Sequence, residues 1–486
     1  MPRALPVRAS ARLADVRAVA LATGVALWVG VLFVVARDAY LGFRLGRFDL
    51  GNMVQAVWST LEGRPLEMTY GATGEQITRL GVHVDPFLAL LSPLWALWPS
   101  PLALALAQVA AVGLGALPVY WLARRHLASE TLATLAALAY LANPWVAWNA
   151  VTAVHPVSFG MPLLLFAVWF LDTNRLGWFA ACAVLAASTG ELMALAVAAL
   201  GLWHAFRPAG RWTGLAIGAS GLAWTLVAVY VVVPAFSGEG SVYYGFYDDV
   251  GGSPQGVVRT LVHDPGAVLG ALFEAHDVAY ALWLAVPLLG LFALAPGLVA
   301  AALPQLLANV LSDFRSMTDP RYHTTAALLP FLVAGAVLGV TRLSRERRTL
   351  ALAAVVVTSL LLTAVVGPWL RAVGLVPLGG RAELAPARVA ALRAAVARVP
   401  EAAPVSVSNS VGAHLSARRT VYSVPVLGAA EWVVVDLADP WVVRAGSPIL
   451  TRDPEQVARF VSRLRADRGW TTIVANDHVV VLQRRS

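Results

Sequence analysis

Long runs of predominantly apolar residues decide what this chain can fold into. The first run extends from Ala18 to Ala36, and further runs lie at 101–123, 130–148, 157–171 and 349–370. Several are long enough to cross about 30 Å of hydrocarbon as helices. Only 13% of the residues are charged, against about 25% in an ordinary soluble domain. We therefore predict a mainly α, polytopic transmembrane helical bundle.

The basic residues of this chain are topology signals. The sequence contains arginine but no lysine, and its formal net charge is +8. Arginines flank the apolar runs, as expected of cytoplasmic loops. No basic stripe with interleaved aromatic residues is present, so we predict no nucleic-acid partner. The only cysteine, Cys182, lies in an apolar run, which excludes an internal disulfide.

The arginine positions also predict the orientation in the cell membrane. The first run follows a basic segment and lacks a convincing cleavage site, so it is a retained span with a cytoplasmic N-terminus. Two longer runs, 176–206 and 278–311, fit the charge pattern only if each folds back as two half-spans. The expected turns are near Glu191 and at Pro296-Gly297. This gives about eleven spans and an extracytoplasmic C-terminus.

Composition changes after the last run. Short β-rich segments, including EWVVVDL at 431–437 and HVVVLQR at 478–484, flank an amphipathic helix at 454–469. We predict a transmembrane domain over 1–375 and a small extracytoplasmic α/β domain over 376–486. Acidic residues at the expected strand ends are either ligand sites or solvated loop residues, namely Asp436, Asp439 and Asp477. No nucleotide-binding motif is present.

A polar, amphipathic stretch follows the first run, RFDLGNMVQAVWSTLEGRPLEMT at 47–69. Its apolar residues recur at helical spacing, so we expect a helix lying on the membrane surface. Asp49, Asn52 and Gln55 form its polar side. Asp49 is either a helix N-cap or a group with a chemical role.

Polar residues that could form a site gather on the predicted outer face, at the ends of different spans. Glu191 is a functional candidate because a carboxylate within an apolar stretch is costly. His83 and His155 could instead satisfy loop backbone. Arg321, Tyr322 and His323 could form an interfacial belt. The candidate set is Asp49, Asn52, Gln55, His83, Asp85, His155, Glu191, Arg315, Arg321, Tyr322 and His323.

Such a set suits sugar transfer from a polyprenyl-phosphate carrier. The reaction needs a carboxylate base for the acceptor hydroxyl, for which we select Asp49. It also needs positive charge on the departing phosphate, for which Arg315 and Arg321 are the candidates. His83, Asp85 and Glu191 could hold Mg²⁺ or Mn²⁺, since oxygen and imidazole ligands suit these ions.

Serial motifs along the chain resemble those of a bacterial membrane-protein family known only as a domain of unknown function. They are FDLGNMVQAVW, HVDPFLALLSPLWALWPSPLALALAQ, HPVSFGMPLL, GELMAL, RYHTTAALLPFL, SNSVGAHLSARRTVYSVP and VVVDLADPW. That family is similar to GT-C class glycosyltransferases, which place a catalytic Asp in the first extracytoplasmic loop. Asp49 matches that position. The resemblance implies an inverting hexosyl or pentosyl transfer to a glycan, lipid or protein acceptor.

Two other classes of function remain open at this point. A transporter or flippase for a lipid or polar solute would also use broken helices and buried acids. Against it, the chain shows no internal repeat, and its polar residues cluster on one face instead of at the midplane. A non-catalytic cell-envelope assembly protein, docking through its outer domain, is the third alternative.

Overall fold

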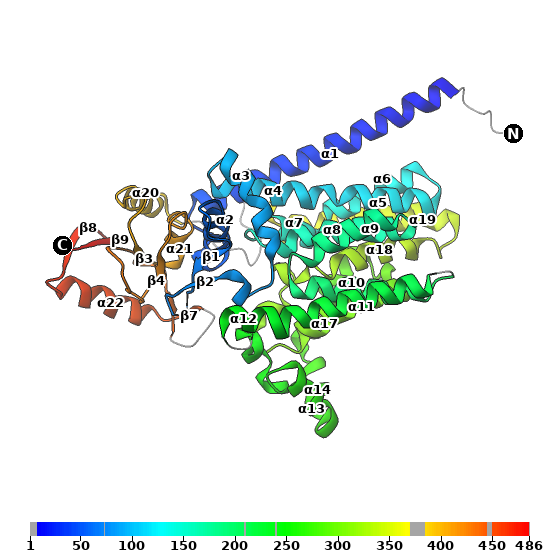
Figure 1. Ribbon diagram of the computed structural model, residues 1–486. Coiled ribbons are helices and arrows are strands. Elements are labelled where there is room, and N and C mark those ends of the chain that lie inside the picture. The colour runs from blue at the N-terminus through cyan, green and yellow to red at the C-terminus, as the bar shows by residue number, and fades with distance from the viewer. Residues whose placement is uncertain are drawn as a thin grey trace.

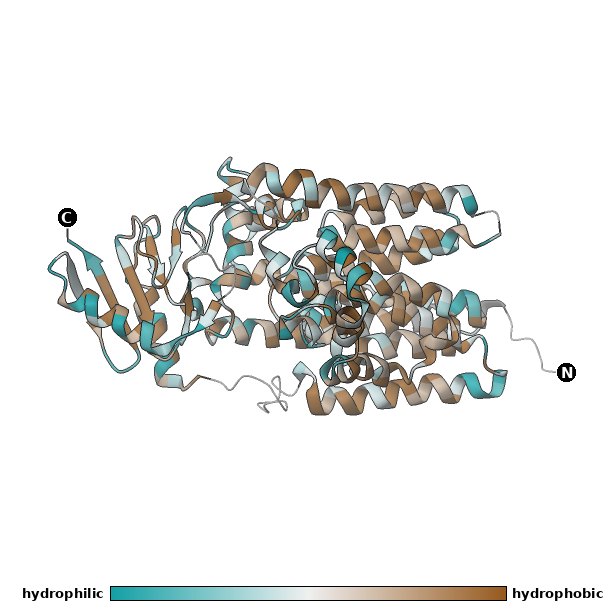
Figure 2. Ribbon diagram, turned by 90° about the horizontal axis from the view of Figure 1, so that it is seen from below, coloured by the Kyte–Doolittle hydropathy of each residue, from teal (hydrophilic) through white to brown (hydrophobic). Residues whose placement is uncertain are grey.

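The protein is an elongated helical bundle with a small α/β domain at one end, while the N-terminus lies at the other end (Figure 1). The computed structural model describes residues 7–71, 73–208, 210–238, 241–369, 384–444 and 450–485. The predicted domain boundary between residues 375 and 376 lies outside the described residues. Apolar residues dominate the bundle, and hydrophilic residues are frequent in the C-terminal domain (Figure 2).

Helices of the bundle run back and forth between its two ends. The main ones are α1 (Val7–Leu41), α4 (Pro101–Leu114), α5 (Ala116–Leu127), α6 (Glu130–Ala142), α7 (Pro144–Val151), α8 (Pro156–Asp172), α9 (Leu176–Ala187), α10 (Glu191–Ala205), α11 (Arg211–Val227), α12 (Val233–Ser237), α15 (Ala275–Ala285), α17 (Leu303–Val310), α18 (Leu329–Val340) and α19 (Arg345–Val366). Within the described residues, four helical stretches are long and apolar enough to cross a membrane, or five if the bent pair of α14 (Pro265–Leu272) and α15 counts as one span. The others are shorter, so the count of about eleven spans stays a prediction.

The first predicted fold-back is present between α9 and α10. The chain turns at residues 188–190, where the Ser188 carbonyl accepts a hydrogen bond from Phe87 N. Glu191 then begins α10 beside His83. At the far end of α10, Arg207 pairs with Asp172, the last residue of α8. Glu191 and Arg207 therefore lie at opposite ends of the bundle.

The second fold-back is also present, but its turn lies earlier than predicted. Leu289 and Gly290 adopt the left-handed conformation, with φ of 50° and 64°. Pro296 instead starts a short helix, because proline suits the first position of a helix. Asn309 Nδ2 donates to the Tyr280 hydroxyl over 2.8 Å, so the two ends of the segment meet.

The long segment between α12 and α15 is largely helical. It contains η5 (Val242–Val250), α13 (Pro254–His263) and α14 (Pro265–Leu272). Ser253 and Asp264 cap α13 and α14 through their side chains. These two helices project sideways from the bundle (Figure 1).

The C-terminal domain has the predicted α/β architecture. Its five-stranded sheet has the order β4-β3-β5-β9-β8, with parallel β3–β4 and β3–β5 pairs and antiparallel β5–β9 and β8–β9 pairs. The elements of the domain are α20 (Pro386–Val396), β3 (Val405–Val407), α21 (Asn409–Gly412), β4 (Val421–Ser423), β5 (Trp432–Asp436), β6 (Trp441–Val443), β7 (Leu450–Arg452), α22 (Pro454–Ala466), β8 (Trp470–Ala475) and β9 (Val479–Arg484). β5 is buried throughout, which explains its continuous apolar sequence.

The stretch after α1 lies between the bundle and this domain. It forms η1 (Arg47–Gly51), α2 (Asn52–Leu61) and a hairpin of β1 (Glu67–Thr69) and β2 (Gln76–Thr78). Val54 and Val57 are buried as expected, but so is Gln55 on the predicted polar side. The C-terminal domain covers the polar side at Gln55, whereas Asp49 stays exposed. The position of this helix relative to a membrane surface stays a prediction.

Candidate functional site

Asp49 lies in η1, the π-helical turn that precedes α2. Its side chain is 57% exposed, and its Oδ1 lies 3.6 Å from His155 Nε2. Asp49 is not a helix N-cap, because the N-cap positions of η1 and α2 are Gly46 and Gly51. The capping explanation for this carboxylate therefore fails, and its exposure leaves it accessible to a ligand.

A stacked pair of histidines lies beside Asp49. The rings of His155 and His323 are parallel within 15°, with centroids 3.7 Å apart. Both Nδ1 atoms are buried, and neither has a hydrogen-bond partner among the described residues. Burial lowers the pKa of His323 well below its usual range, and the positive charges of His155, His83 and Arg79 act in the same direction. His323 is consequently neutral near pH 7.

The two histidines come from loops that are fastened together. Gln108 of α4 donates to the carbonyls of Asn149, Ala150 and Ala153, and its Oε1 accepts from His155 N over 2.7 Å. Thr152 Oγ1 donates to the Arg321 carbonyl over 2.8 Å. The loop carrying His155 is thus held against the segment carrying Arg321 and His323. Gln108, a lone amide in an apolar run, was missed by sequence reasoning, and its isolation was the available signal.

A second group of charges adjoins the histidine pair. His83 Nδ1 lies 3.1 Å from Glu191 Oε1, and Val84 N donates to Glu191 Oε2 over 3.3 Å. Arg79 Nε pairs with Asp85 Oδ2 over 2.7 Å, and both side chains are buried. The charges of His83 and Arg79 help to lower the pKa of His323, so they lie near enough to His323 to act on it electrostatically. Asp49, His155, His323, His83 and Glu191 therefore gather at the same end of the bundle.

Arg321 and Arg315 line a cavity of about 400 Å³. The Arg321 guanidinium forms a two-pronged ion pair with Asp319, at 2.9 Å and 2.6 Å. Apolar groups complete the wall, including the indoles of Trp145 and Trp283 and the side chain of Val366. The cavity thus combines guanidinium groups with a greasy lining. Trp283 was not predicted, because tryptophans at membrane ends are ordinarily interfacial anchors.

Other predicted residues have structural partners instead. Gln55 Nε2 donates to the carbonyls of Arg418 and Arg419 in the C-terminal domain, and Gln55 Oε1 accepts from Thr69 N. This side chain is 2% exposed, so we remove it from the proposed ligand site. Asn52 Nδ2 donates to the Phe48 carbonyl, which fastens it to η1. Tyr322 is half-buried at the start of the short helix that carries His323.

The predicted metal set does not assemble. Among the described residues, no group of three or more His, Cys, Asp and Glu side chains is arranged to hold a metal ion. Asp85 is committed to Arg79, while His83 and Glu191 bind each other. The proposed chemistry therefore includes no metal ion bound by His83, Asp85 and Glu191.

The sequence matches a family described as predicted membrane protein (DUF2079) over residues 40–481. The chain belongs to this family. The protein is accordingly a membrane protein, in agreement with its apolar helices. No functionally curated protein matches the sequence.

Solved structures share the fold at low sequence identity. ArnT from Cupriavidus metallidurans bound to undecaprenyl phosphate is 16% identical with a TM-score of 0.54, and the match covers 95% of this chain and 98% of ArnT. The apo state of ArnT gives a TM-score of 0.52 at the same identity and coverage. The Archaeoglobus fulgidus oligosaccharyltransferase is more distant, with 12% identity, a TM-score of 0.47 and coverage of 84% of this chain and 69% of that one. This DUF2079 protein therefore has the GT-C-like architecture that its motifs predicted.

Proposed function

We propose that this DUF2079 protein is a GT-C type glycosyltransferase that transfers a hexosyl or pentosyl group from a polyprenyl-phosphate donor to an acceptor at the outer membrane face. The observation that carries the proposal is the exposed Asp49 carboxylate beside the His155–His323 pair. The fold supports this proposal, because ArnT, which is similar to this chain over almost its whole length, was solved with undecaprenyl phosphate bound.

Asp49 is the proposed general base. Its carboxylate accepts the proton of the acceptor hydroxyl as that oxygen forms a bond to the anomeric carbon of the sugar. The bond between the anomeric carbon and the phosphate oxygen breaks, and both of its electrons leave with the polyprenyl phosphate. Attack opposite to the leaving group inverts the configuration. His155 lies 3.6 Å from Asp49 and orients the carboxylate.

The cavity lined by Arg321 and Arg315 is the proposed position of the carrier phosphate. Guanidinium groups suit a phosphate because they donate several hydrogen bonds and keep their charge. Trp145, Trp283 and Val366 provide apolar surface for the adjoining prenyl chain. The Arg321 carbonyl accepts from Thr152 of the loop that carries His155, so the proposed phosphate position is coupled to the base through one hydrogen-bonded loop.

We also propose that the N-terminus is cytoplasmic and that the C-terminal domain lies outside the cell with the site. A cysteine introduced at Ala385 in a Cys182→Ala background should react with a membrane-impermeant thiol reagent in intact cells. Reaction only after permeabilisation would reverse the topology and move the site to the cytoplasmic face.

The function is tested by incubating the purified protein with a panel of undecaprenyl-phosphoryl sugars and membrane-derived acceptors. The expected result is release of undecaprenyl phosphate and labelling of an acceptor by at least one donor. Asp49→Asn should abolish most of both signals, while Glu62→Gln, an exposed carboxylate change at the end of α2, should leave them unchanged. Tight donor binding without release in the wild type would instead support a flippase.

A further inference from the structure

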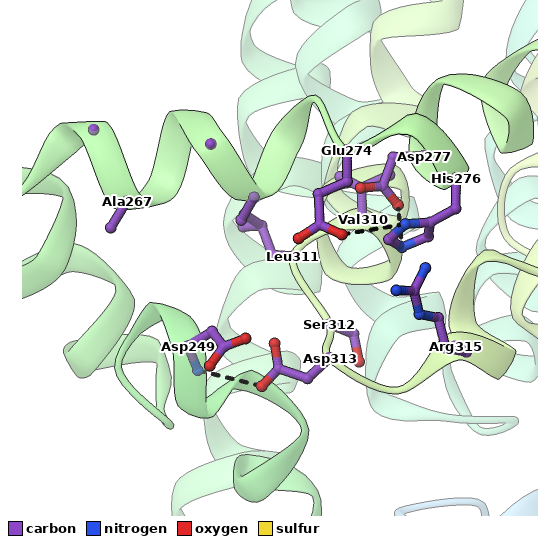
Figure 3. A pocket seen from close by; sticks show the side chains of 13 residues that line it. Asp249, Ala267, Glu274, His276, Asp277, Val310, Leu311, Ser312, Asp313 and Arg315 are labelled. Carbon is purple, nitrogen blue, oxygen red and sulfur yellow. Dashed lines mark hydrogen bonds and ion pairs between the residues drawn. The ribbon is translucent and has the colours of Figure 1, made fainter.

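Figure 3 shows a second cavity, which has a volume of about 270 Å³. It adjoins the proposed phosphate cavity. It lies in the angle between α14 and α15, which are bent by 47° relative to each other. Gly266, Ala267 and Gly270 of α14 form one wall, and the start of α15 and the segment after α17 form the others. His276 and Arg315 line both cavities.

The lining is strongly acidic, with a single arginine. Its carboxylates come from Asp249, Glu274, Asp277 and Asp313. Figure 3 shows the Arg315 side chain extending toward His276 on the same side of the cavity as Glu274 and Asp277. The excess of carboxylates disfavours a simple anion and favours a ligand that carries positive charge.

Asp277 is the most deeply buried carboxylate of the lining. Its side chain is only 3% exposed. His276 lies between two of the carboxylates, with Nε2 3.1 Å from Asp277 Oδ1 and Nδ1 3.3 Å from Glu274 Oε2, but neither Asp277 oxygen accepts a hydrogen bond from the described residues. A buried carboxylate without hydrogen bonds is costly. An ammonium group in the cavity would supply the missing donors.

The chemistry of the lining favours an organic ligand that carries both a positive and a negative group. In the described part of the chain, these carboxylates and His276 are not arranged to hold a metal ion. The Arg315 guanidinium lines both this cavity and the proposed carrier cavity, and its charge acts on Asp277, so it can hold an anionic group at either position. A ligand with an ammonium group close to a phosphate would satisfy both Asp277 and Arg315.

The surface around the cavity is apolar. On α14 and just after it, Leu269 and Phe273 are 53% and 72% exposed. On α15, Val278 and Leu282 are 47% and 58% exposed. Exposed side chains of this kind suit acyl chains, since α14 and α15 form a bent apolar pair long enough to enter a membrane. The cavity is thus a polar pit in a greasy surface, as a lipid headgroup requires.

We propose that this cavity binds a phosphoethanolamine group, with the ammonium at Asp277 and Glu274 and the phosphate at Arg315. The source of that group is either a phosphatidylethanolamine molecule of the bilayer or a soluble phosphoethanolamine compound. The apolar surround favours the lipid. This site does not depend on whether the protein transfers sugars.

Native mass spectrometry of the purified protein tests the proposal with short-chain phosphatidylethanolamine, phosphatidylcholine and phosphatidylglycerol. Phosphatidylethanolamine should bind most tightly, because the quaternary ammonium of phosphatidylcholine has no N–H donor and phosphatidylglycerol has no ammonium. Asp277→Asn should weaken phosphatidylethanolamine binding by roughly tenfold or more. Arg259→Gln on α13 and Asp248→Asn beside the cavity change side chains outside its lining and should leave binding unchanged.

Two further arms complete the test. Glycerophosphoethanolamine is added as a competitor: strong competition assigns the site to a soluble ligand, and weak competition assigns it to the lipid, each with the same headgroup chemistry. If Asp277→Asn does not fold, Glu274→Gln replaces it, since Glu274 is largely exposed. Equal binding of all three lipids, or binding unaffected by the lining variants, would overturn the proposal.

Discussion

The two ends of the bundle use carboxylates in opposite ways. At the end near the N-terminus, Asp172 is 2% exposed and is paired with Arg125, His126 and Arg207 at 3.1, 2.9 and 3.1 Å. At the other end, the Asp49 side chain is 57% exposed, and its Oδ1 lies 3.6 Å from His155 Nε2. In the first cluster both carboxylate oxygens of Asp172 have charged partners. In the second, two buried imidazole nitrogens have no hydrogen-bond partner in the described structure.

This difference separates a structural cluster from a chemical one. The ion pairs of Asp172 connect the ends of α5, α8 and α10. Both of its carboxylate oxygens are engaged in these pairs instead of facing a ligand. The Asp49 cluster maintains accessible charge and unused hydrogen-bonding groups, which stable cores ordinarily avoid. Such groups are typical of sites that bind or transform a ligand.

The largest expected effect concerns Asp49 itself. Asp49→Asn and Asp49→Ala should each lower sugar transfer by about 10²-fold or more, the usual scale for loss of a general base. Both variants should melt at the wild-type temperature, because Asp49 caps no helix. Transfer assays and thermal melts on the same preparations check this. Loss of activity only in the alanine variant would point to a structural role for the side chain.

Gln55 tests the attachment of the C-terminal domain to the Asp49 end. Gln55→Leu leaves the carbonyls of Arg418 and Arg419 without their amide donor, in a buried contact. We expect a loss of about 2–3 kcal/mol in unfolding free energy and faster proteolysis of the C-terminal domain. Gln483→Leu is the matched control, because Gln483 is exposed on β9. Equal protease resistance in both variants would contradict the proposed coupling.

Asp172→Asn should affect stability but not chemistry. Its hydrogen-bonded charge contacts weaken, while Arg125 and Arg207 can turn toward water because they are 52% and 35% exposed. The expected destabilisation is therefore modest, about 1–2 kcal/mol. Thermal melting with transfer rates normalised to folded protein measures both effects, with the exposed Glu346→Gln as control. A large drop in the normalised rate would place functional residues at this end as well.

The smallest effect near pH 7 is a pH dependence at the junction of α1 and the C-terminal domain. His414 stacks on Tyr40 and Phe43, and burial lowers its pKa from 6.5 to about 4. Between these two values the unfolded chain binds a proton that the folded protein does not. Stability should therefore fall as the pH falls from 6.5 toward 4, by up to about 1.4 kcal/mol per pH unit.

His414→Gln keeps a donor near the Tyr40 carbonyl but cannot titrate. Melting temperatures measured from pH 7.5 to 4.5 should decline less in this variant than in the wild type. Identical profiles would mean that His414 is not buried in its neutral form. The remaining slope of the variant would include His323, whose pKa is lowered in the same direction.

Sequence patterns predicted the features that depend on local composition. Apolar runs gave the helical bundle, and the buried Trp432–Asp436 strand gave the core of the C-terminal sheet. The candidate residues Asp49, His155, Glu191 and His323 were found because charged groups at the ends of apolar runs are conspicuous.

Long-range contacts were beyond the sequence. The burial of Gln55 depends on Arg418 and Arg419, more than three hundred residues away, and no local pattern indicates that partner. The displaced turn at Leu289 depends on left-handed backbone at a non-glycine residue, which sequence rules disfavour. The wall of the proposed phosphate cavity joins Trp145, Trp283 and Val366 from three separate helical segments, so only tertiary structure could assemble it.

A cryo-electron microscopy structure with undecaprenyl phosphate tests the central claim most directly, because it reveals which end of the bundle holds the carrier. Our account predicts phosphate density against Arg321 and Arg315, in the cavity walled by Trp145 and Trp283, with the prenyl chain leaving toward the membrane. Phosphate density beside Arg125 and Arg207 at the opposite end, with the Arg321 cavity empty, would contradict the account.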